Sequence, residues 1–322
     1  MRTFLLVFLT AALVSCSTGS GHDWPRWRGP NGDGISREKG WNPKALEGGP
    51  RIAWKMDIRA GYSGIAIQNN RLYTMGGDFE DVFVCCLNAA TGKELWRYSF
   101  PGFSVPQATP TVEGSAVYCL STEGLLLCLN ARNGKLKWKK DLVADHGCLK
   151  PYYGFAGSPV IVGDLLILTA NTSGIALAKR TGTKIWVSEA PPKSARSFAS
   201  NGTEYHTPVI YSNNGKPHAL ICSWKGVFGV EVETGKAQLL FDWEKSYLLS
   251  GSQTADPAMA GGKALVVGPM AHYPGSVCLD VRSNELKPVW TSKDTFSELG
   301  SPVFFDGYFY VSQGGGDRKG FL

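Results

Sequence analysis

The chain has 322 residues, enough for one large all-β domain or two average domains with a substantial buried core. Glycine (39 residues) and proline (18) together make about 18% of the chain, against about 12% in an average protein, and this disfavours helix bundles and coiled coils. Charged residues make 19%, and the formal net charge is only +6 with no long basic run. The composition therefore argues against a disordered chain and against a nucleic-acid partner.

Residues 1–15 have the pattern of an export signal. Arg2 is their only charged residue, and the apolar run over residues 4–14 is too short to cross a bilayer as a helix. The sequence LVSC at residues 13–16 resembles the bacterial lipoprotein processing motif. That resemblance implies a lipoprotein signal peptide over residues 1–15 and a lipid on Cys16. The alternative is an ordinary cleavage site with an incidental cysteine, which also places the protein outside the cytoplasm.

A tether and a strap are expected next. Ser17, where an aspartate would retain the protein at the inner membrane, generally permits export of a Gram-negative lipoprotein to the outer membrane. We expect the protein on the periplasmic side of that membrane, or secreted to the periplasm. Residues 16–23 are predicted to be a tether. Residues 24–50 are predicted to strap or plug the following domain, because residues 23–34 (DWPRWRGPNGDG) place two tryptophans among turn residues, and these need an apolar surface to cover.

Two elements recur along residues 51–322. The first ends in tryptophan and occurs as NAATGKELW (88–96), NARNGKLKW (130–138) and TGTKIW (181–186), with degenerate copies at 234–236 and 283–290. The second is a small residue, a proline and an apolar residue; its prolines are Pro110, Pro159, Pro208, Pro257 and Pro302, which lie 49, 49, 49 and 45 residues apart. Repeats of this length indicate stacked or radial supersecondary units.

Each period contains four short stretches of β-forming residues separated by turns. Four strands per period predict a blade of a β-propeller. The Thr-Gly or Asn-Gly pair supplies the positive φ of a tight hairpin between the third and fourth strands, and the repeated tryptophan is expected to pack between neighbouring blades. A β-helical solenoid is the alternative, but such solenoids repeat over far fewer residues.

The motif Leu-(Asn/Asp)-Ala-x-(Thr/Asn)-Gly-Lys-x-x-Trp resembles the pyrroloquinoline quinone (PQQ)-type β-propeller repeat. Residues 24–34 are similar to the N-terminus of an uncharacterised bacterial branch of that superfamily. The resemblance covers roughly residues 23–322 and implies the fold. The superfamily includes quinoprotein dehydrogenases, the lipoprotein subunit of the outer-membrane β-barrel assembly machine, and members without known activity, so the fold leaves the function open.

Counting the repeats gives an all-β fold with five full four-stranded blades and a partial sixth. Trp54, in the stretch IAWKM at residues 52–56, has the pattern of an outer strand with no blade before it. PQQ-type rings commonly have seven or eight blades, and the printed sequence stops where the first repeat would continue. We therefore expect a C-terminally incomplete ring over residues 51–322, an open arc with an unpaired edge.

The adjacent residues Cys85 and Cys86 suggest a redox hypothesis, since PQQ dehydrogenases use a disulfide between adjacent cysteines against the cofactor. Successive side chains of a strand point to opposite faces, however, and this pair lies inside a predicted third strand. Aligning the repeats puts Cys86, Cys128, Ala176, Gly229 and Cys278 in one slot, which is predicted to need a small residue. No Cys-x-x-Cys pair or zinc-type histidine spacing occurs, so no metal site is predicted.

A ligand or partner is expected on the face where the interblade loops and the loops between second and third strands emerge. Aromatic residues mixed with charged ones on such loops suit a polar ligand or a peptide. The structural alternative is that the tyrosines and histidines fill the bases of the loops while the charges are solvated. The candidate residues are Tyr152, Tyr153, Arg196, Glu204, His206, Trp224, Lys225 and His272.

Two functions fit this sequence. The first is a membrane-tethered, non-catalytic propeller that binds an envelope protein or a polar small ligand through its loop face and needs no cofactor. The alternative is a PQQ- and calcium-dependent quinoprotein oxidoreductase acting on alcohols or sugars, with PQQ in the central channel. The second function needs a catalytic aspartate and calcium ligands. The loop carboxylates Glu204, Asp256 and Asp317 fall in no matching motif, so the sequence favours binding.

Overall fold

The computed structural model describes residues 23–40, 42–102, 104–189, 204–223, 225–242, 254–268, 275–283, 287–297, 299–315 and 318–321. Within these ranges the chain forms β-strands and one short 3₁₀ helix, η1 (Pro43–Leu46), but no α-helix. None of the helical structure in these ranges is long and apolar enough to cross a membrane.

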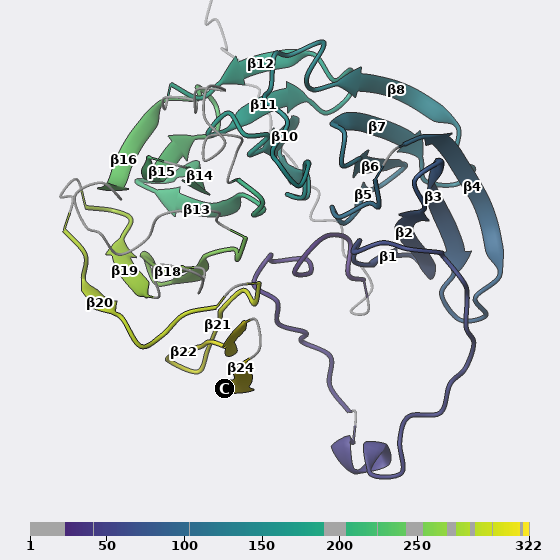
Figure 1. The fold of residues 1–322 in the computed structure, drawn as a ribbon, viewed down its shortest axis with the longest axis horizontal. Coiled ribbons are helices and arrows are strands. Elements are labelled where there is room, and N and C mark those ends of the chain that lie inside the picture. The colour runs from purple at the N-terminus through teal and green to yellow at the C-terminus, as the bar shows by residue number, and fades with distance from the viewer. Residues whose placement is uncertain are drawn as a thin grey trace, which may run out of the picture.

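In the described part of the chain, five four-stranded antiparallel sheets follow one another and fan around a common centre (Figure 1). Their strands are β1 (Ala66–Gln68), β2 (Arg71–Gly77), β3 (Asp81–Asn88) and β4 (Glu94–Pro101); β5 (Thr111–Glu113), β6 (Ala116–Leu120), β7 (Leu125–Asn130) and β8 (Leu136–Asp141); β9 (Val160–Val162), β10 (Leu165–Leu168), β11 (Ile175–Ala178) and β12 (Lys184–Val187); β13 (Val209–Asn213), β14 (Lys216–Cys222), β15 (Gly226–Glu231) and β16 (Ala237–Asp242); and β17 (Ala258–Ala260), β18 (Lys263–Val267), β19 (Ser276–Asp280) and β20 (Trp290–Ser292). Within each sheet the strands are hydrogen-bonded in chain order.

A partial sixth blade follows, made of two two-stranded sheets. Its strands are β21 (Val303–Phe305), β22 (Tyr308–Tyr310), β23 (Gln313–Gly315) and β24 (Arg318–Phe321). Among the described strands, none joins this blade to the first one, so the sheets form an open arc (Figure 1). The predicted all-β propeller, with five full blades and part of a sixth, is confirmed.

The repeated prolines occupy equivalent places at the centre. Each one directly precedes the first strand of its blade, where its missing N–H removes no ladder hydrogen bond. Hydrogen bonds link neighbouring blades at the position before the prolines and at Gly64, which holds the equivalent place before blade 1. The backbone N–H at this position donates to a side-chain oxygen at the same position one blade further on. These bonds run from Gly64 to Thr109 (3.1 Å), Thr109 to Ser158 (2.9 Å), Ser158 to Thr207 (3.1 Å), Thr207 to Asp256 (2.7 Å) and Asp256 to Ser301 (2.9 Å).

The repeated tryptophans lock each blade to the next. The Trp96 indole N–H donates to the carbonyl of Ala131 at 3.0 Å, and its ring lies against Gly134 in the third hairpin turn of the following blade. Trp138 and Trp186 make the same pair of contacts with the blades that follow them. Trp54 does so with blade 1, donating to the Ala89 carbonyl at 3.0 Å, so it makes the contact of an outer-strand tryptophan as its sequence pattern predicts.

Replacing Gly134 by alanine tests this lock. Gly134 has φ +71°, and a Cβ atom there would lie 2.6 Å from the Trp96 ring. We expect a loss of about 2–3 kcal/mol in the free energy of unfolding, from backbone strain and a displaced indole. Gly114→Ala is the matched control, since its φ is +55° and no atom lies within 4 Å of the added Cβ. Equal losses for the two variants in urea unfolding would contradict the tryptophan contact.

The hydrophobic core lies between blades. Separate buried clusters join blades 1 and 2, 2 and 3, 3 and 4, 4 and 5, and 5 and 6. Alternate residues of each central strand face opposite neighbours, so these strands are apolar on both sides. Each central blade is therefore held in the arc by packing against both neighbouring blades.

Cys85 and Cys86 follow this alternation and form no disulfide. Cys86 lies in the cluster between blades 1 and 2, and Cys85 lies in a separate cluster with Trp54. Burial raises the pKa of the Cys85 thiol to about 11, which disfavours the reactive thiolate. Four members of the slot, Cys86, Cys128, Ala176 and Cys278, pair with the outer-strand tryptophan of their own blade, which explains the preference for small residues. The fifth member, Gly229, pairs with Gln238, and a Cβ atom there would lie 2.2 Å from the Tyr211 hydroxyl. The prediction of a structural slot is confirmed.

Candidate functional site

The segment of residues 23–34 lies across the inner strands of the arc (Figure 1). Trp24 exchanges two backbone hydrogen bonds with Ile67 of β1, at 2.9 and 2.7 Å. Further contacts reach successive blades: Pro25 O accepts from Val112 N at 2.8 Å, Trp27 Nε1 donates to Asp256, and Arg28 Nη2 donates to Pro302 O at 2.6 Å. One short segment thus touches blades at both ends of the arc.

The Asp256 carboxylate is the polar anchor of this segment. It is buried and accepts hydrogen bonds from the Thr207 backbone N–H at 2.7 Å and from the Trp27 indole N–H. Burial raises the pKa of this carboxyl, while the two donors and the nearby Arg28 guanidinium act in the opposite direction. Arg28 is buried too, and its Nη2 also donates to Asp33 O at 3.1 Å. Desolvation lowers the pKa of Arg28, and the attraction of Asp256 opposes that shift.

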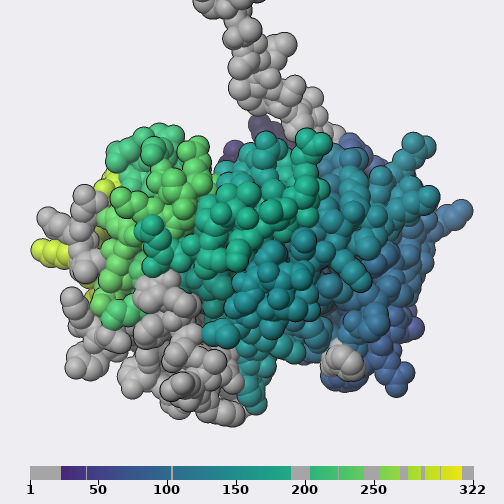
Figure 2. All heavy atoms as spheres, turned by 90° about the horizontal axis from the view of Figure 1, so that it is seen from above, coloured from purple at the N-terminus to yellow at the C-terminus, as the bar shows by residue number. Residues whose placement is uncertain are grey.

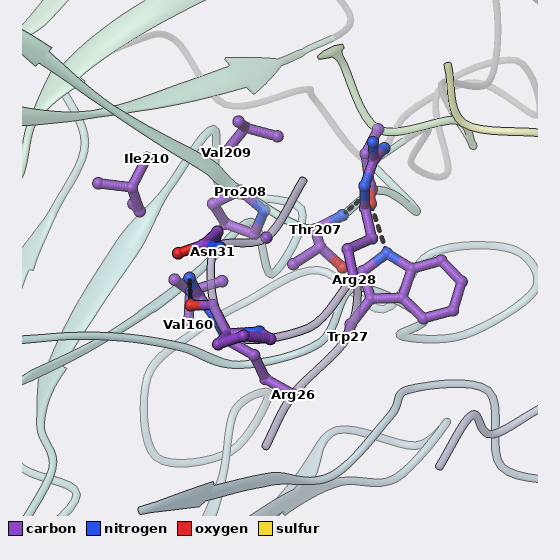
Figure 3. Close-up of a pocket in the computed structure, with 12 residues that line it drawn as sticks. Arg26, Trp27, Arg28, Asn31, Val160, Thr207, Pro208, Val209 and Ile210 are labelled. Carbon is purple, nitrogen blue, oxygen red and sulfur yellow. Dashed lines mark hydrogen bonds between the residues drawn. The ribbon is translucent and has the colours of Figure 1, made fainter. Parts of the chain in front are cut away.

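A cavity of about 320 Å³ lies between this segment and blades 3 to 5 (Figure 3). The segment supplies one wall with Arg26, Arg28 and Asn31, and the first strand of blade 4 supplies another with Val209 and Ile210. Arg26 is turned back on its own loop, donating to the carbonyls of Gly29 and Pro30 at 3.2 and 3.0 Å. Arg26 is therefore engaged in holding the segment, whereas the Nε and Nη1 atoms of Arg28 are buried without a hydrogen-bond partner in the described part of the chain.

The second candidate is the face formed by the interblade loops. Residues 151–154 make a tight turn in which the Gly154 N–H donates to the Pro151 carbonyl at 2.9 Å and Gly154 has φ +80°. The two central residues, Tyr152 and Tyr153, project from this turn and are 57% and 65% exposed. Their rings pack edge to face with centroids 4.9 Å apart.

Neighbouring loops brace this pair. The Tyr153 carbonyl accepts from Gln107 Nε2 at 2.6 Å, and its N–H donates to the Tyr205 hydroxyl at 3.3 Å. The loop that carries Gln107 also accepts from the Tyr62 N–H, through Pro106 O at 2.8 Å. The exposed rings are therefore held on connected backbone rather than on a free loop.

Two further members of this surface, Tyr62 and Phe79, are 80% and 70% exposed and were not predicted from the sequence. The loop of Phe79 is joined to the segment of Tyr62 by the Arg59–Asp78 ion pair at 3.0 Å and by backbone bonds between Ala60 and Gly77. We call Tyr62, Phe79, Tyr152 and Tyr153 the aromatic loop face. In the sequence, these two residues could have been recognised only as aromatic residues in short loops of the first blade.

Glu204 and His206 lie beneath this face and are buried, so they offer it no exposed surface. Glu204 accepts from the Ser173 N–H at 3.1 and 3.0 Å, and so ties the interblade loop to blade 3. His206 Nε2 accepts from the Cys222 N–H at 3.1 Å, and burial lowers the pKa of this imidazole to about 3. Both therefore hold the loops in place.

Lys225 is half-buried beside Asp242, with its Nζ 3.4 Å from a carboxylate oxygen. Four other predicted residues, Cys16, Arg196, Trp224 and His272, lie outside the described residues, as does the carboxylate of Asp317. The structure thus brings Tyr152 and Tyr153 together at the surface and places Glu204 and His206 below them.

The family model described as outer membrane protein assembly factor BamB matches residues 45–169 and 106–317. The chain belongs to this BamB family. No curated protein matches it by sequence.

Among solved structures, BamB from Moraxella catarrhalis is similar with a TM-score of 0.62 at 16% identity, over 82% of this chain and 74% of that one. The quinohemoprotein alcohol dehydrogenase from Comamonas testosteroni gives 0.60 at 14% identity, over 88% of this chain and 52% of that one. A europium-containing methanol dehydrogenase gives 0.50 at 11% identity, over 91% and 82%. Identities this low show a shared fold alone.

PQQ and calcium are the groups that the alternative function expected from the sequence would require at this site. Calcium takes six to eight oxygen ligands. The described part of the chain contains no group of three or more His, Cys, Asp or Glu side chains placed to hold a metal. The buried Asp256 carboxylate accepts hydrogen bonds from Thr207 and Trp27, which lies in the segment of residues 23–34 that crosses the inner strands of the arc.

Proposed function

We propose that this BamB-family propeller is a non-catalytic scaffold of the bacterial envelope, which binds a protein partner through its aromatic loop face. The observation that carries the proposal is the Tyr152–Tyr153 pair, exposed yet fixed by the 151–154 turn and by Gln107 and Tyr205. Rigid exposed tyrosines supply a large contact area at a low entropy cost, and they are enriched among the residues that dominate binding energy.

The quinoprotein alternative has less support. It needs a cofactor site on the axis, and there the chain's own Trp27 and Arg28 are packed against Asp256 and Pro302. A direct test is to add PQQ and Ca²⁺ to the purified protein and to follow cofactor absorbance and alcohol-dependent dye reduction. Stoichiometric uptake with turnover would contradict the scaffold proposal.

We also propose that a lipid on Cys16 holds the scaffold at the periplasmic side of the outer membrane. The support is the LVSC motif at residues 13–16 together with membership of a family described as outer membrane protein assembly factors. Mass spectrometry of the mature chain should show a lipidated N-terminal cysteine, and Cys16→Ala should abolish it.

The partner site is tested with a photo-crosslinking amino acid at position 153 in cells that make the protein. We expect one discrete crosslinked protein, because the Tyr153 side chain projects from the face. With that partner purified, the double variant Tyr152→Ala, Tyr153→Ala should bind at least about 30-fold more weakly, as expected for loss of two aromatic anchors.

Tyr308 provides the matched control. It is 69% exposed but lies on β22 of the sixth blade, away from the aromatic loop face. Crosslinking from position 308 should not capture the same protein, and Tyr308→Ala should leave its affinity unchanged. Equal capture from both positions, or unchanged affinity of the double variant, would remove the aromatic loop face as the partner site.

A further inference from the structure

The arc of blades has two faces, and Figure 2 shows it edge-on. The loops and turns that join the strands differ between these two faces. The aromatic loop face carries the interblade loops and the loops between second and third strands. The opposite face, here called the turn face, carries the hairpin turns between first and second strands and between third and fourth strands. In blades 1 to 3 the turns of the second kind are residues 89–93, 131–135 and 179–183.

The N-terminal segment enters the arc from the turn face. Asp23 Oδ1 accepts from the N–H of Asn69, in the turn between β1 and β2, at 3.0 Å. Trp24 then pairs with Ile67 inside the arc. Only seven residue steps separate Cys16 from Asp23, and a fully extended chain of that length spans at most about 25 Å. A lipid on Cys16 would therefore hold the turn face of blade 1 close to the membrane.

The turn face of blades 1 to 3 is also basic. Five exposed cations come from its third-to-fourth-strand turns or their edges: Lys93, Arg132, Lys135, Arg180 and Lys184. Within the described chain none of the five forms an ion pair. The acidic residues on this face lie beside other cations: Glu94 pairs with Arg97 at 2.7 Å, and Glu113 and the exposed Asp164 share Lys179, at 2.7 and 3.8 Å.

The loop side of the same blades carries charges of both signs. Its acidic residues include Asp78, Glu80, Asp81, Asp141 and Asp145, and its basic residues include Arg59, Lys140 and Lys150. The five cations of the turn side complement a negatively charged surface there. Lysine and arginine residues near an anionic bilayer each strengthen binding by about fivefold.

We propose that the turn face of blades 1 to 3 rests on anionic phospholipid headgroups, so that the aromatic loop face points away from the membrane. This inference rests on the proposed lipid anchor at Cys16. It specifies which surface of the scaffold is available to a protein partner and which is occupied by lipid.

The test uses the mature, lipid-anchored chain in vesicles of phosphatidylethanolamine with or without phosphatidylglycerol. A fluorophore is placed on a single introduced cysteine, either Thr183→Cys on the turn face or Glu80→Cys on the loop side, both exposed positions. The seven cysteines of the described chain are buried and should stay unlabelled. With phosphatidylglycerol present, a headgroup-attached quencher should quench the probe at 183 at least about threefold more than the probe at 80.

Reversing four cations, with Lys93→Glu, Arg132→Glu, Lys135→Glu and Arg180→Glu, should abolish that difference. The matched control carries the same charge change at exposed lysines off this face: Lys44→Glu, Lys139→Glu, Lys150→Glu and Lys293→Glu. It should quench like the parent. Unfolding midpoints of both variants show whether they remain folded.

Equal quenching at the two positions in anchored protein, or quenching insensitive to the four reversals, would overturn the inference. Failure of the anchor itself is seen separately, as an unlipidated mature chain by mass spectrometry. In that case sedimentation of the unanchored chain with phosphatidylglycerol vesicles tests the turn face directly. Retention that the four reversals reduce by at least about tenfold supports it, and no retention at low salt overturns it.

Discussion

Replacing Asp256 by alanine is expected to lower the free energy of unfolding by about 3–5 kcal/mol, because a buried carboxylate that accepts two hydrogen bonds is lost. The substitution leaves the Thr207 N–H and the Trp27 indole N–H without their acceptor, and it removes the charge opposite the buried Arg28. Urea unfolding measures the loss. Asp164→Ala, at a carboxylate whose side chain is 90% exposed, is the control and should cost less than about 0.5 kcal/mol.

A serine at position 256 separates two roles of this carboxylate. Serine stands at the equivalent positions 158 and 301, where it accepts the hydrogen bond that links neighbouring blades. Asp256→Ser should therefore restore part of the loss by accepting from Thr207, while the contacts with Trp27 and Arg28 stay broken. We expect proteolysis after residues 26 and 28 to become faster in both variants. Full restoration by serine would mean that Asp256 does not anchor the N-terminal segment.

Acidification is expected to destabilise the protein through His206. The imidazole is buried, its Nε2 accepts from the Cys222 N–H, and its pKa is lowered to about 3. Because the unfolded chain has a histidine pKa near 6.5, it binds more protons than the folded chain between about pH 6.5 and 3. Stability from the neutral ring is therefore fully present above pH 6.5 and falls as the pH drops. Between pH 7 and 5 the loss should be about 2 kcal/mol.

His206→Gln isolates this contribution, since a glutamine oxygen can still accept from Cys222 but does not titrate. The variant should be less stable than the parent at pH 7 and should lose about 2 kcal/mol less between pH 7 and 5, as measured by urea unfolding at both values. Other titrating groups cancel in this difference. Parallel pH curves for the two proteins would show that the His206 ring is not held neutral in the folded state.

The repeats explain why much of the fold could be predicted. Four strands, a turn glycine and a tryptophan recur because each blade packs against the next one in the same way, as the Trp96–Gly134 contact shows. The small residue before each proline was recognised as a pattern, but its reason was not. Structure shows that Thr109, Ser158 and Thr207 are there for their side-chain oxygens. Asp256 is the aspartate of that series, and its carboxylate also accepts a hydrogen bond from Trp27.

The candidate site was harder to predict because exposure depends on contacts between distant residues. Tyr152 and Tyr153 were identified from a long loop rich in aromatic and charged residues, and they lie at the surface. Glu204 and His206 have the same local pattern, yet the packing of blades 3 and 4 buries them. Tyr62 and Phe79 were missed because nothing in their short loops distinguishes an exposed ring from a packed one.

The sequence by itself determined the period, the number and order of the blades, and the alternation that puts Cys85 and Cys86 on opposite faces, since these follow from local β-geometry repeated along the chain. Only the tertiary structure decided that Trp27 meets Asp256 across 229 residues, and which loops present their aromatic rings together. Burial and proximity between remote segments are set by how all the blades pack around one centre, and no local pattern encodes that arrangement.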